Sequence, residues 1–251
     1  IYYVGVFQSL IEHKIIIRTD IKHIVCCSSG SLFGLLFLLG YSLDFIKTIV
    51  FSIDFENLFE YDDLLDLFSK NGLFSIDKFV KIFEIALLGK QFKKDITMKE
   101  LYEQTNINYV LKVYNYTDEL DEYISHENYP DIPVLKAISM SCSIPILFKT
   151  IEHEDKIYVD GGITGSTPTV KDERYKNNIC IQIKNKQKNQ IETPYTFITN
   201  IFKIGKDKYV KKNKQTIFIH CCKGIKLTDF SVKTCDKQDM ITHAKLLTDI
   251  H

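Results

Sequence analysis

The sequence predicts an α/β fold of three layers, α/β/α, in which helices cover a central and mostly parallel sheet. Short apolar runs typical of strands alternate with segments of helical periodicity along the chain. Residues 23–27 are continuously apolar after His23, as expected of a central parallel strand. The 251 residues, 45% of them hydrophobic, are enough to bury one full core. We therefore expect a single domain over residues 1–251.

The elements can be placed in order from these patterns. A helix is expected over residues 2–11. A second helix is expected after the strand at 23–27 and should end at a C-cap at Gly40, and Ser42 can cap the helix that follows. Residues 42–103 carry helical periodicity and are expected to form a helical insert. The later segments are predicted as strands at 109–114, 156–160, 178–183 and 216–221, and as a terminal helix over 236–247.

Composition narrows the partners and the compartment. The formal net charge is zero, which gives no overall attraction to nucleic acid. The basic run Lys203–Lys214 is interpreted as a solvated face, with a membrane-surface patch as the alternative. Seven cysteines without Cys-x-x-Cys or Cys/His spacing predict no zinc site and favour a reducing, intracellular (cytoplasmic) setting. The longest apolar stretch, Leu32–Leu43, is too short to span a bilayer.

A serine stands where the strand at 23–27 gives way to a helix. Such a sharp turn exposes the hydroxyl of Ser28 and directs the positive end of the helix toward it, as in a nucleophile elbow. The usual pattern is Gly-x-Ser-x-Gly, and here Gly30 fills the second small position while Cys26 fills the first. The competing interpretation is an ordinary N-cap, in which Ser28 or Ser29 accepts a backbone N–H.

An aspartate enters a glycine-rich turn 132 residues later. Asp160-Gly161-Gly162 follows a short alternating strand and leads toward Pro168. Locally this is a favourable turn sequence, because glycine adopts positive φ freely and aspartate bonds its own backbone. Together with Ser28, however, the carboxylate offers the base that a serine hydroxyl needs to become a nucleophile.

These two motifs, with the segments between them, resemble the patatin-like phospholipases. That family carries a Gly-x-Ser-x-Gly elbow and an Asp-Gly-Gly/Ala turn, which form a Ser–Asp dyad without histidine. The stretch from Ala137 to Phe148 is similar to the family's Ala-x-x-x-Ser-x-x-x-Pro-x-x-Phe. Residues 96–101 are similar to the start of a helix in the middle region of the family. The resemblance covers residues 1–170 in order.

The resemblance implies a patatin-like fold and a metal-free lipid acyl hydrolase of the phospholipase A or lysophospholipase type, without a cofactor. Ser28 would be the nucleophile and Asp160 the general base, while the backbone N–H of Ser29 would contribute to the oxyanion hole. The family's glycine-rich oxyanion loop precedes its first helix, so we expect the chain to be N-terminally truncated and the rest of the hole to lie upstream of Ile1. The insert would cap the acyl site. The implied partner is a lipid or membrane-surface substrate, which leaves open peripheral membrane association, and the oligomeric state stays unknown.

Three alternatives remain open at this point. A Ser-Asp-His esterase would use His220 or His243 as the base. The nucleophile could instead be a neighbour of Ser28, namely Ser29, Ser31 or Cys27. A different class of function, a lipid-binding pseudo-hydrolase, is favoured by Cys26 in the elbow and by the expected truncation.

Overall fold

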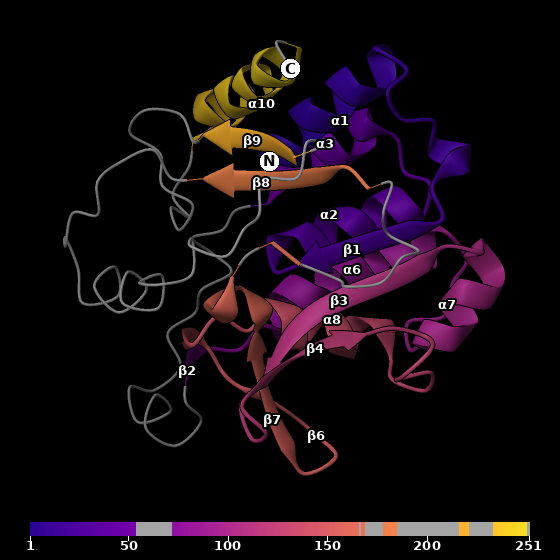
Figure 1. Ribbon diagram of the computed structural model, residues 1–251, viewed down its shortest axis with the longest axis vertical. Helices are drawn as coiled ribbons and strands as arrows, with labels where there is room; N and C mark the ends of the chain where they lie inside the picture. The colour runs from indigo at the N-terminus through magenta and orange to yellow at the C-terminus, as the bar shows by residue number, and fades with distance from the viewer. Residues whose placement is uncertain (54–71, 166, 169–177, 185–215, 221–232, 250–251) are drawn as a thin grey trace.

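The computed structural model describes residues 1–53, 72–165, 167–168, 178–184, 216–220 and 233–249 (Figure 1). The basic run Lys203–Lys214 lies outside these residues, as do residues 54–71 of the expected insert. The elements are α1 (Tyr2–Glu12), η1 (Arg18–Asp20), β1 (His23–Cys27), α2 (Ser29–Leu38), α3 (Leu43–Ser52), β2 (Gly72–Phe74), α6 (Asp77–Gly89), α7 (Met98–Thr105), β3 (Asn108–Asn115), β4 (Leu120–Ile124), α8 (Val134–Cys142), β5 (Ile146–Phe148), β6 (Ile151–His153), β7 (Lys156–Asp160), η2 (Gly161–Thr164), β8 (Cys180–Lys184), β9 (Thr216–His220) and α10 (Thr234–Asp249).

The central sheet has the strand order β1-β3-β7-β6, and β4 also pairs with β3. The α/β class is confirmed, but the expectation of a mostly parallel sheet needs a correction. Within the described residues of this sheet, β1 and β3 are parallel, whereas the β3–β4, β3–β7 and β6–β7 pairs are antiparallel. For two of these pairs the reason is local, because the β3–β4 and β6–β7 connections are short enough to form hairpins. Two further pairs, β2–β5 and β8–β9, are parallel.

Strand β3 brings the ends of β1 and β7 together. One of its edges pairs with β4 over residues 111–115, so β1 and β7 must share the other edge. On that edge Cys27, the last residue of β1, faces Lys112, and Asp160, the last residue of β7, faces Val113. Because β1 runs parallel to β3 and β7 antiparallel, the two strands approach each other head to head. The turns that follow Cys27 and Asp160 therefore meet at one point.

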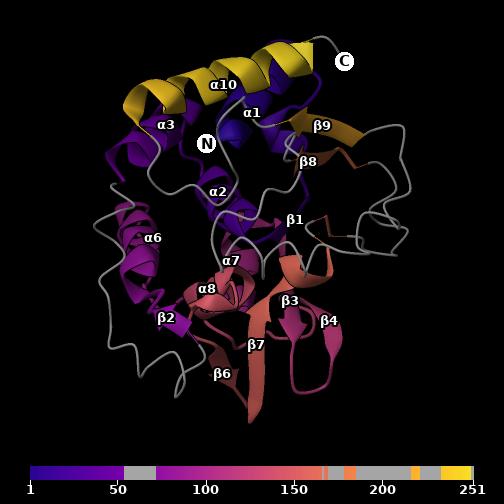
Figure 2. The same ribbon diagram turned by 90° about the vertical axis from the view of Figure 1, so that its left-hand side faces the viewer.

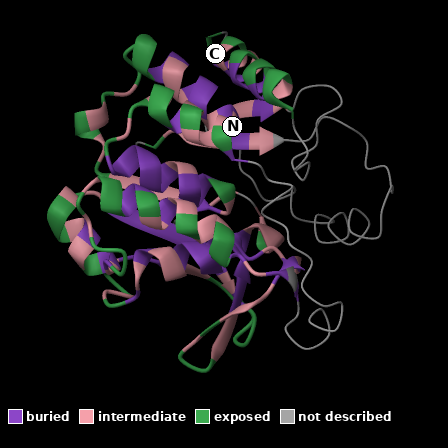
Figure 3. Ribbon diagram, turned by 180° about the vertical axis from the view of Figure 1, so that it is seen from behind, coloured by how far each residue is buried: buried purple, intermediate pink, exposed green. Residues whose placement is uncertain are grey.

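Helices α2 and α8 pack against the central sheet, and α6 packs behind α8 (Figure 1). The largest hydrophobic cluster lies between these elements, and Figure 3 shows buried residues gathered at the centre of the molecule. A second cluster joins α1 and α10 to the β8–β9 pair. Helix α10 crosses over α1 and α3 (Figure 2), and its buried Lys237 donates through Nζ to the carbonyls of Val50 and Ile53 at the end of α3, at 3.1 and 3.0 Å.

Most element boundaries agree with the sequence. The strand at 23–27 is confirmed without change, and Ser42 caps α3 by accepting the Phe45 amide at 3.2 Å. Residues 42–103 are not wholly helical, since they include the short strand β2, which pairs with β5. Among the described residues, none of the helices has the length and apolar character needed to cross a bilayer.

Candidate active site

Ser28 occupies a sharp and unusual turn between β1 and α2. Its backbone has φ 54° and ψ −132°, a region that L-residues rarely adopt and that costs on the order of 1–3 kcal/mol. Its side chain makes no cap hydrogen bond to the helix, so the N-cap interpretation is wrong for Ser28. Instead, the Ser28 side chain lies close enough to the Asp160 carboxylate to lower the pKa of that carboxyl. The turn thus presents the hydroxyl to another part of the chain.

Cys26 fits into the elbow because α2 lacks a side chain at the facing position. A Cβ added to Gly34 would lie 2.6 Å from the Cys26 Sγ, closer than such atoms approach, and 3.2 Å from Ile24 Cγ2, a tight contact. The thiol therefore takes the space that a side chain at position 34 would fill. Burial raises the pKa of Cys26 to about 12, so it stays a neutral core thiol. The departure from the glycine pattern at position 26 is matched by a glycine at position 34.

Asp160 ends β7 with its side chain turned back into the site. The carboxylate is buried, only 3% exposed, and its Oδ1 accepts the Gly162 backbone N–H at 2.6 Å. The Cys27 thiol donates to the same oxygen at 3.8 Å. Gly161 must lack a side chain, because a Cβ there would lie 2.7 Å from the Lys112 carbonyl oxygen. The two glycines let the chain turn directly against β3 and keep the carboxylate at the strand end.

Burial raises the pKa of Asp160 from 3.8 to about 6. Desolvation is the main cause, because a charged carboxylate loses its hydration in the interior. The hydrogen bonds from Ser28, Gly162 and Cys27 and the positive charge of Lys112 act in the opposite direction and limit the increase. A carboxylate with its pKa near 6 is ionised at neutral pH, yet it is basic enough to accept a proton from a nearby hydroxyl.

The end of α8 holds both turns in place. The Ser141 Oγ accepts the Ser28 backbone N–H at 3.1 Å and donates to the Lys112 carbonyl at 2.8 Å. The Cys142 thiol donates to the Ser28 carbonyl at 3.1 Å. The Asp160 backbone N–H donates to the Ser143 carbonyl at 2.9 Å. Three consecutive residues of one helix end therefore fix the backbone of both Ser28 and Asp160.

The competing nucleophiles are placed less favourably. The Ser31 side chain is fully buried and its Oγ lies 3.0 Å from Ser141 Oγ. The Cys27 thiol is buried, and desolvation together with the Asp160 charge raises its pKa well above the usual value, which disfavours the thiolate that attack requires. Ser29 is exposed in the first helical turn, and Gly30 is buried behind it. First-turn amides such as that of Ser29 have no partner within the helix and can face an anion.

Neither candidate histidine has a described contact with the Ser28–Asp160 pair. His220 ends β9, and the His243 Nε2 on α10 lies 2.9 Å from the His220 carbonyl oxygen. Within the part of the chain that the structure describes, the two histidines contact each other beside the β8–β9 pair. The geometry favours the Ser–Asp pair over a Ser-Asp-His arrangement.

Sequence reasoning missed two residues of this site, Lys112 and Ser141. Lys112 is charged but stands inside the apolar strand 109–114, and this mismatch was a signal that it has buried partners. Ser141 lies in the stretch that resembles the family, but its contact with the elbow depends on how α8 packs. Both are buried, at 3% and 0% exposure.

Comparison with known proteins identifies the family of the chain. The model of a family described as patatin-like phospholipase matches residues 1–170. Among curated proteins, a "Probable lipid hydrolase 463L" of Invertebrate iridescent virus 6 is 28% identical over 213 residues, covering 81% of this chain and 68% of that protein. An "Uncharacterized protein R571" of Acanthamoeba polyphaga mimivirus is 28% identical over 189 residues, covering 74% of this chain and 62% of that protein.

Two solved structures share the fold at low sequence identity. VipD from Legionella pneumophila superposes with a TM-score of 0.73 at 13% identity, covering 99% of this chain and 64% of that one. The type III effector protein ExoU gives a TM-score of 0.51 at 11% identity, covering 99% of this chain and 50% of that one. The chain spans about two thirds or less of the length of these relatives. With the family match over more than half of its residues, this chain belongs to the patatin-like phospholipase family.

Proposed function

We propose that this protein is a lipid acyl hydrolase that cleaves carboxylic esters through a Ser28–Asp160 dyad. One observation carries the proposal: the Ser28 hydroxyl, held out of any local cap by a strained turn, stands beside the buried Asp160 carboxylate of a distant strand, which the adjacent Cys27 thiol also contacts. Few structural roles need a strained serine beside a desolvated base, whereas nucleophilic catalysis needs both. Family membership and the virus relative named as a probable lipid hydrolase support the same class of reaction.

The proposed reaction has two steps through an acyl-enzyme. Ser28 Oγ forms a bond to the ester carbonyl carbon while its proton passes to Asp160, and the amide of Ser29 at the start of α2 stabilises the developing oxyanion. The intermediate collapses, the ester C–O bond breaks, and the leaving alcohol takes the proton from Asp160. Asp160 then accepts a proton from the water that attacks the acyl carbon. The bond between the acyl carbon and Ser28 Oγ breaks, Ser28 Oγ takes the proton back from Asp160, and the fatty acid leaves.

The proposed substrates are acyl esters of glycerolipids presented at a membrane surface. The family description and the zero net charge are both compatible with such a neutral or zwitterionic substrate. The phospholipase A and lysophospholipase reactions share this chemistry and differ in how many acyl chains the lipid carries. The same dyad would serve both.

The test is fatty acid release from phosphatidylcholine vesicles and lysophosphatidylcholine micelles, with labelling by a fluorophosphonate probe. The protein is expressed with whatever residues precede Ile1 in its gene. We expect hydrolysis and labelling by the wild type and neither by Ser28→Ala. The matched control is Ser29→Ala, which should keep both because its backbone N–H is retained.

Other outcomes separate the alternatives. If Ser29→Ala lost hydrolysis and labelling while Ser28→Ala kept both, the assignment of Ser28 as the nucleophile would be contradicted. Loss of hydrolysis in His243→Ala or His220→Ala with a folded protein would favour the Ser-Asp-His esterase. A wild type that binds vesicles tightly but releases no fatty acid would instead support the lipid-binding pseudo-hydrolase.

A further inference from the structure

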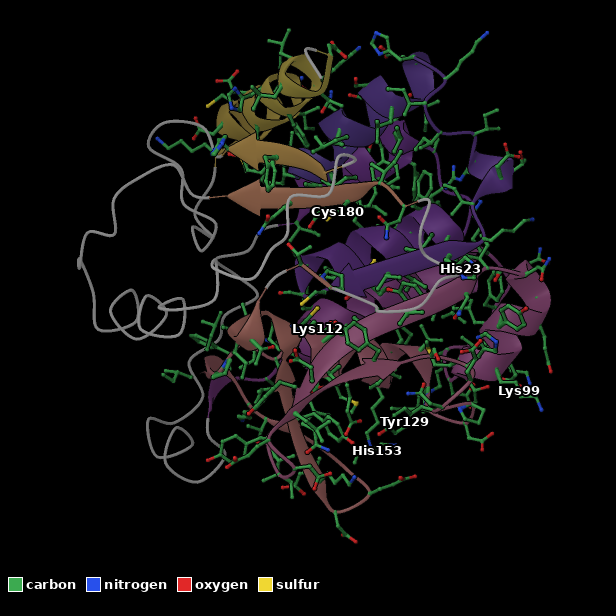
Figure 4. All side chains as sticks on the ribbon, in the orientation of Figure 1. His23, Lys99, Lys112, Tyr129, His153 and Cys180 are labelled. Atoms are coloured by element: carbon green, nitrogen blue, oxygen red, sulfur yellow. The ribbon has the colours of Figure 1, made fainter. Side chains whose placement is uncertain are left out.

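Lys112 is a buried lysine at the junction of the two active-site turns. Its side chain is 3% exposed, and Figure 4 labels it near the centre of the molecule, in contrast to Lys99 at the edge. It faces Cys27 across the β1–β3 pair, one residue away from the Val113–Asp160 pair. A buried ammonium is expensive unless each of its protons has an acceptor.

The ammonium group of Lys112 has three polar partners, and two of these belong to the turn that carries Asp160. Nζ donates to Thr164 Oγ1 at 2.9 Å and to the Gly165 carbonyl at 3.0 Å. The third partner is the Asp121 carboxylate on β4, whose Oδ2 lies 3.1 Å away. The Thr164 hydroxyl in turn donates to Asp121. The lysine therefore ties the far end of the Asp160–Gly165 turn to the sheet.

The backbone of Lys112 holds the other turn. Its carbonyl accepts the Ser141 hydroxyl, which accepts the Ser28 amide, and the same carbonyl lies where Gly161 passes. One residue of β3 thus contacts the Asp160 turn through its side chain and the Ser28 turn through its backbone.

We propose that Lys112 is a positioning residue that fixes the Asp160–Gly165 turn and supplies a positive charge near the Asp160 carboxylate. This inference rests on the proposed function, since it concerns the base of that reaction. The groups near Asp160 in the described residues are Ser28 after β1, the thiol of Cys27 at the end of β1, the Cys142 thiol of α8, and Lys112 of β3, whose ion-pair partner is Asp121 of β4. Lys112 is the cation among them.

The charge of Lys112 lowers the pKa of Asp160 against the larger effect of burial, which leaves it at about 6. Because the base must be ionised, activity is expected to fall as the pH drops through about 6. Lys112→Met keeps the length and the apolar stem but removes the charge. In this variant we expect the acid side of the pH–activity profile to move to higher pH by about one unit. That is the lower end of the change that one neighbouring charge causes in the pKa of a carboxyl group.

Asp121→Asn is a second variant, and it should shift the pH profile in the opposite direction. It removes a negative charge near the site and keeps Lys112, so the acid limb should move to lower pH. Thr164→Val removes one contact of the turn without changing any charge, and it should lower the plateau of kcat while the midpoint of the pH profile stays in place. Lys237→Met is the matched control, because this buried lysine of α10 binds carbonyls at the end of α3 and its loss should affect stability but not the pH midpoint.

The measurement has two readouts, the pH profile of p-nitrophenyl butyrate hydrolysis and the titration of the Asp160 carboxyl carbon by NMR, assigned from the signal missing in Asp160→Asn. Opposite shifts in Lys112→Met and Asp121→Asn in either readout support the proposal. Unchanged midpoints in both variants would overturn it. If the dyad itself were wrong, Ser28→Ala would still hydrolyse the ester, and the NMR titration would test Lys112 independently.

Discussion

Two strand-to-helix turns form the candidate site, and they use their side chains in opposite ways. Asp160 has an ordinary backbone, φ −52°, and its carboxylate caps η2 by accepting the Gly162 amide. Ser28 stands at the same kind of junction but has φ 54° and no cap bond. The aspartate side chain caps its own turn, whereas the serine backbone is strained and its hydroxyl makes no cap to its own helix.

The difference shows where the two turns obtain their stability. The Asp160 turn has a local cap from its own carboxylate, and it is held further by the Lys112 side chain and the Ser143 carbonyl. The Ser28 turn depends on α8, whose Ser141 and Cys142 bind its amide and its carbonyl. A strained residue persists only when its surroundings hold it in place. The four predictions below test this contrast, from the largest expected effect to the smallest.

Asp160→Asn should lower turnover at least about 1000-fold, because the amide cannot accept the serine proton. The same change should stabilise the fold at pH 8 by about 2 kcal/mol, since the raised pKa of Asp160 makes its ionisation unfavourable in the folded state. That penalty is absent below about pH 4 and grows as the pH rises through about 6. Urea unfolding at pH 4 and pH 8 checks the sign, and a variant less stable only at pH 8 would contradict it.

Ser141→Ala should disturb the Ser28 turn more than the Asp160 turn. Loss of the acceptor for the Ser28 amide should cost about 1–3 kcal/mol of unfolding free energy and about 10- to 100-fold in kcat. The control is Ser139→Ala, which lies on the same helix but donates to the Leu135 carbonyl. Equal losses of kcat in both variants would mean that the Ser141 hydroxyl has no specific role in positioning Ser28.

Gly34→Ala should destabilise the elbow by about 1–3 kcal/mol, because the added methyl overlaps the Cys26 thiol. Removing the thiol in Cys26→Ala should recover most of this loss, so the two changes should couple strongly in a double-mutant cycle. Thermal or urea unfolding of the four proteins provides the measurement. Additive losses would show that Cys26 is not the partner of Gly34.

Ser28→Gly should abolish hydrolysis but raise the free energy of unfolding by about 1 kcal/mol, since glycine adopts positive φ without strain. Ser28→Ala is the control, because alanine keeps the strain and should leave stability nearly unchanged. Urea midpoints of both variants test the pair. A glycine variant no more stable than the alanine variant would mean that the Ser28 backbone is not strained.

Much of the site could be predicted from the sequence because its signals are local. Strand 23–27, the serine after it, and Asp160-Gly161-Gly162 each depend on residues that are neighbours in the chain. The same is true of the Ser42 cap. The assignment of Ser28 and Asp160 as catalytic residues stays a prediction until the variants are measured.

Contacts between residues that are distant in sequence were decided only by the tertiary structure. Local patterns do not specify pairing partners, so the mixed direction of the strands, the pairing of β2 with β5, and the meeting of β1 and β7 on one edge of β3 required the fold. The fit of Cys26 against Gly34 and the buried contacts of Lys112 and Ser141 arise from close packing between separate elements. The sequence by itself determined which turns form, and long-range packing decided that their side chains meet.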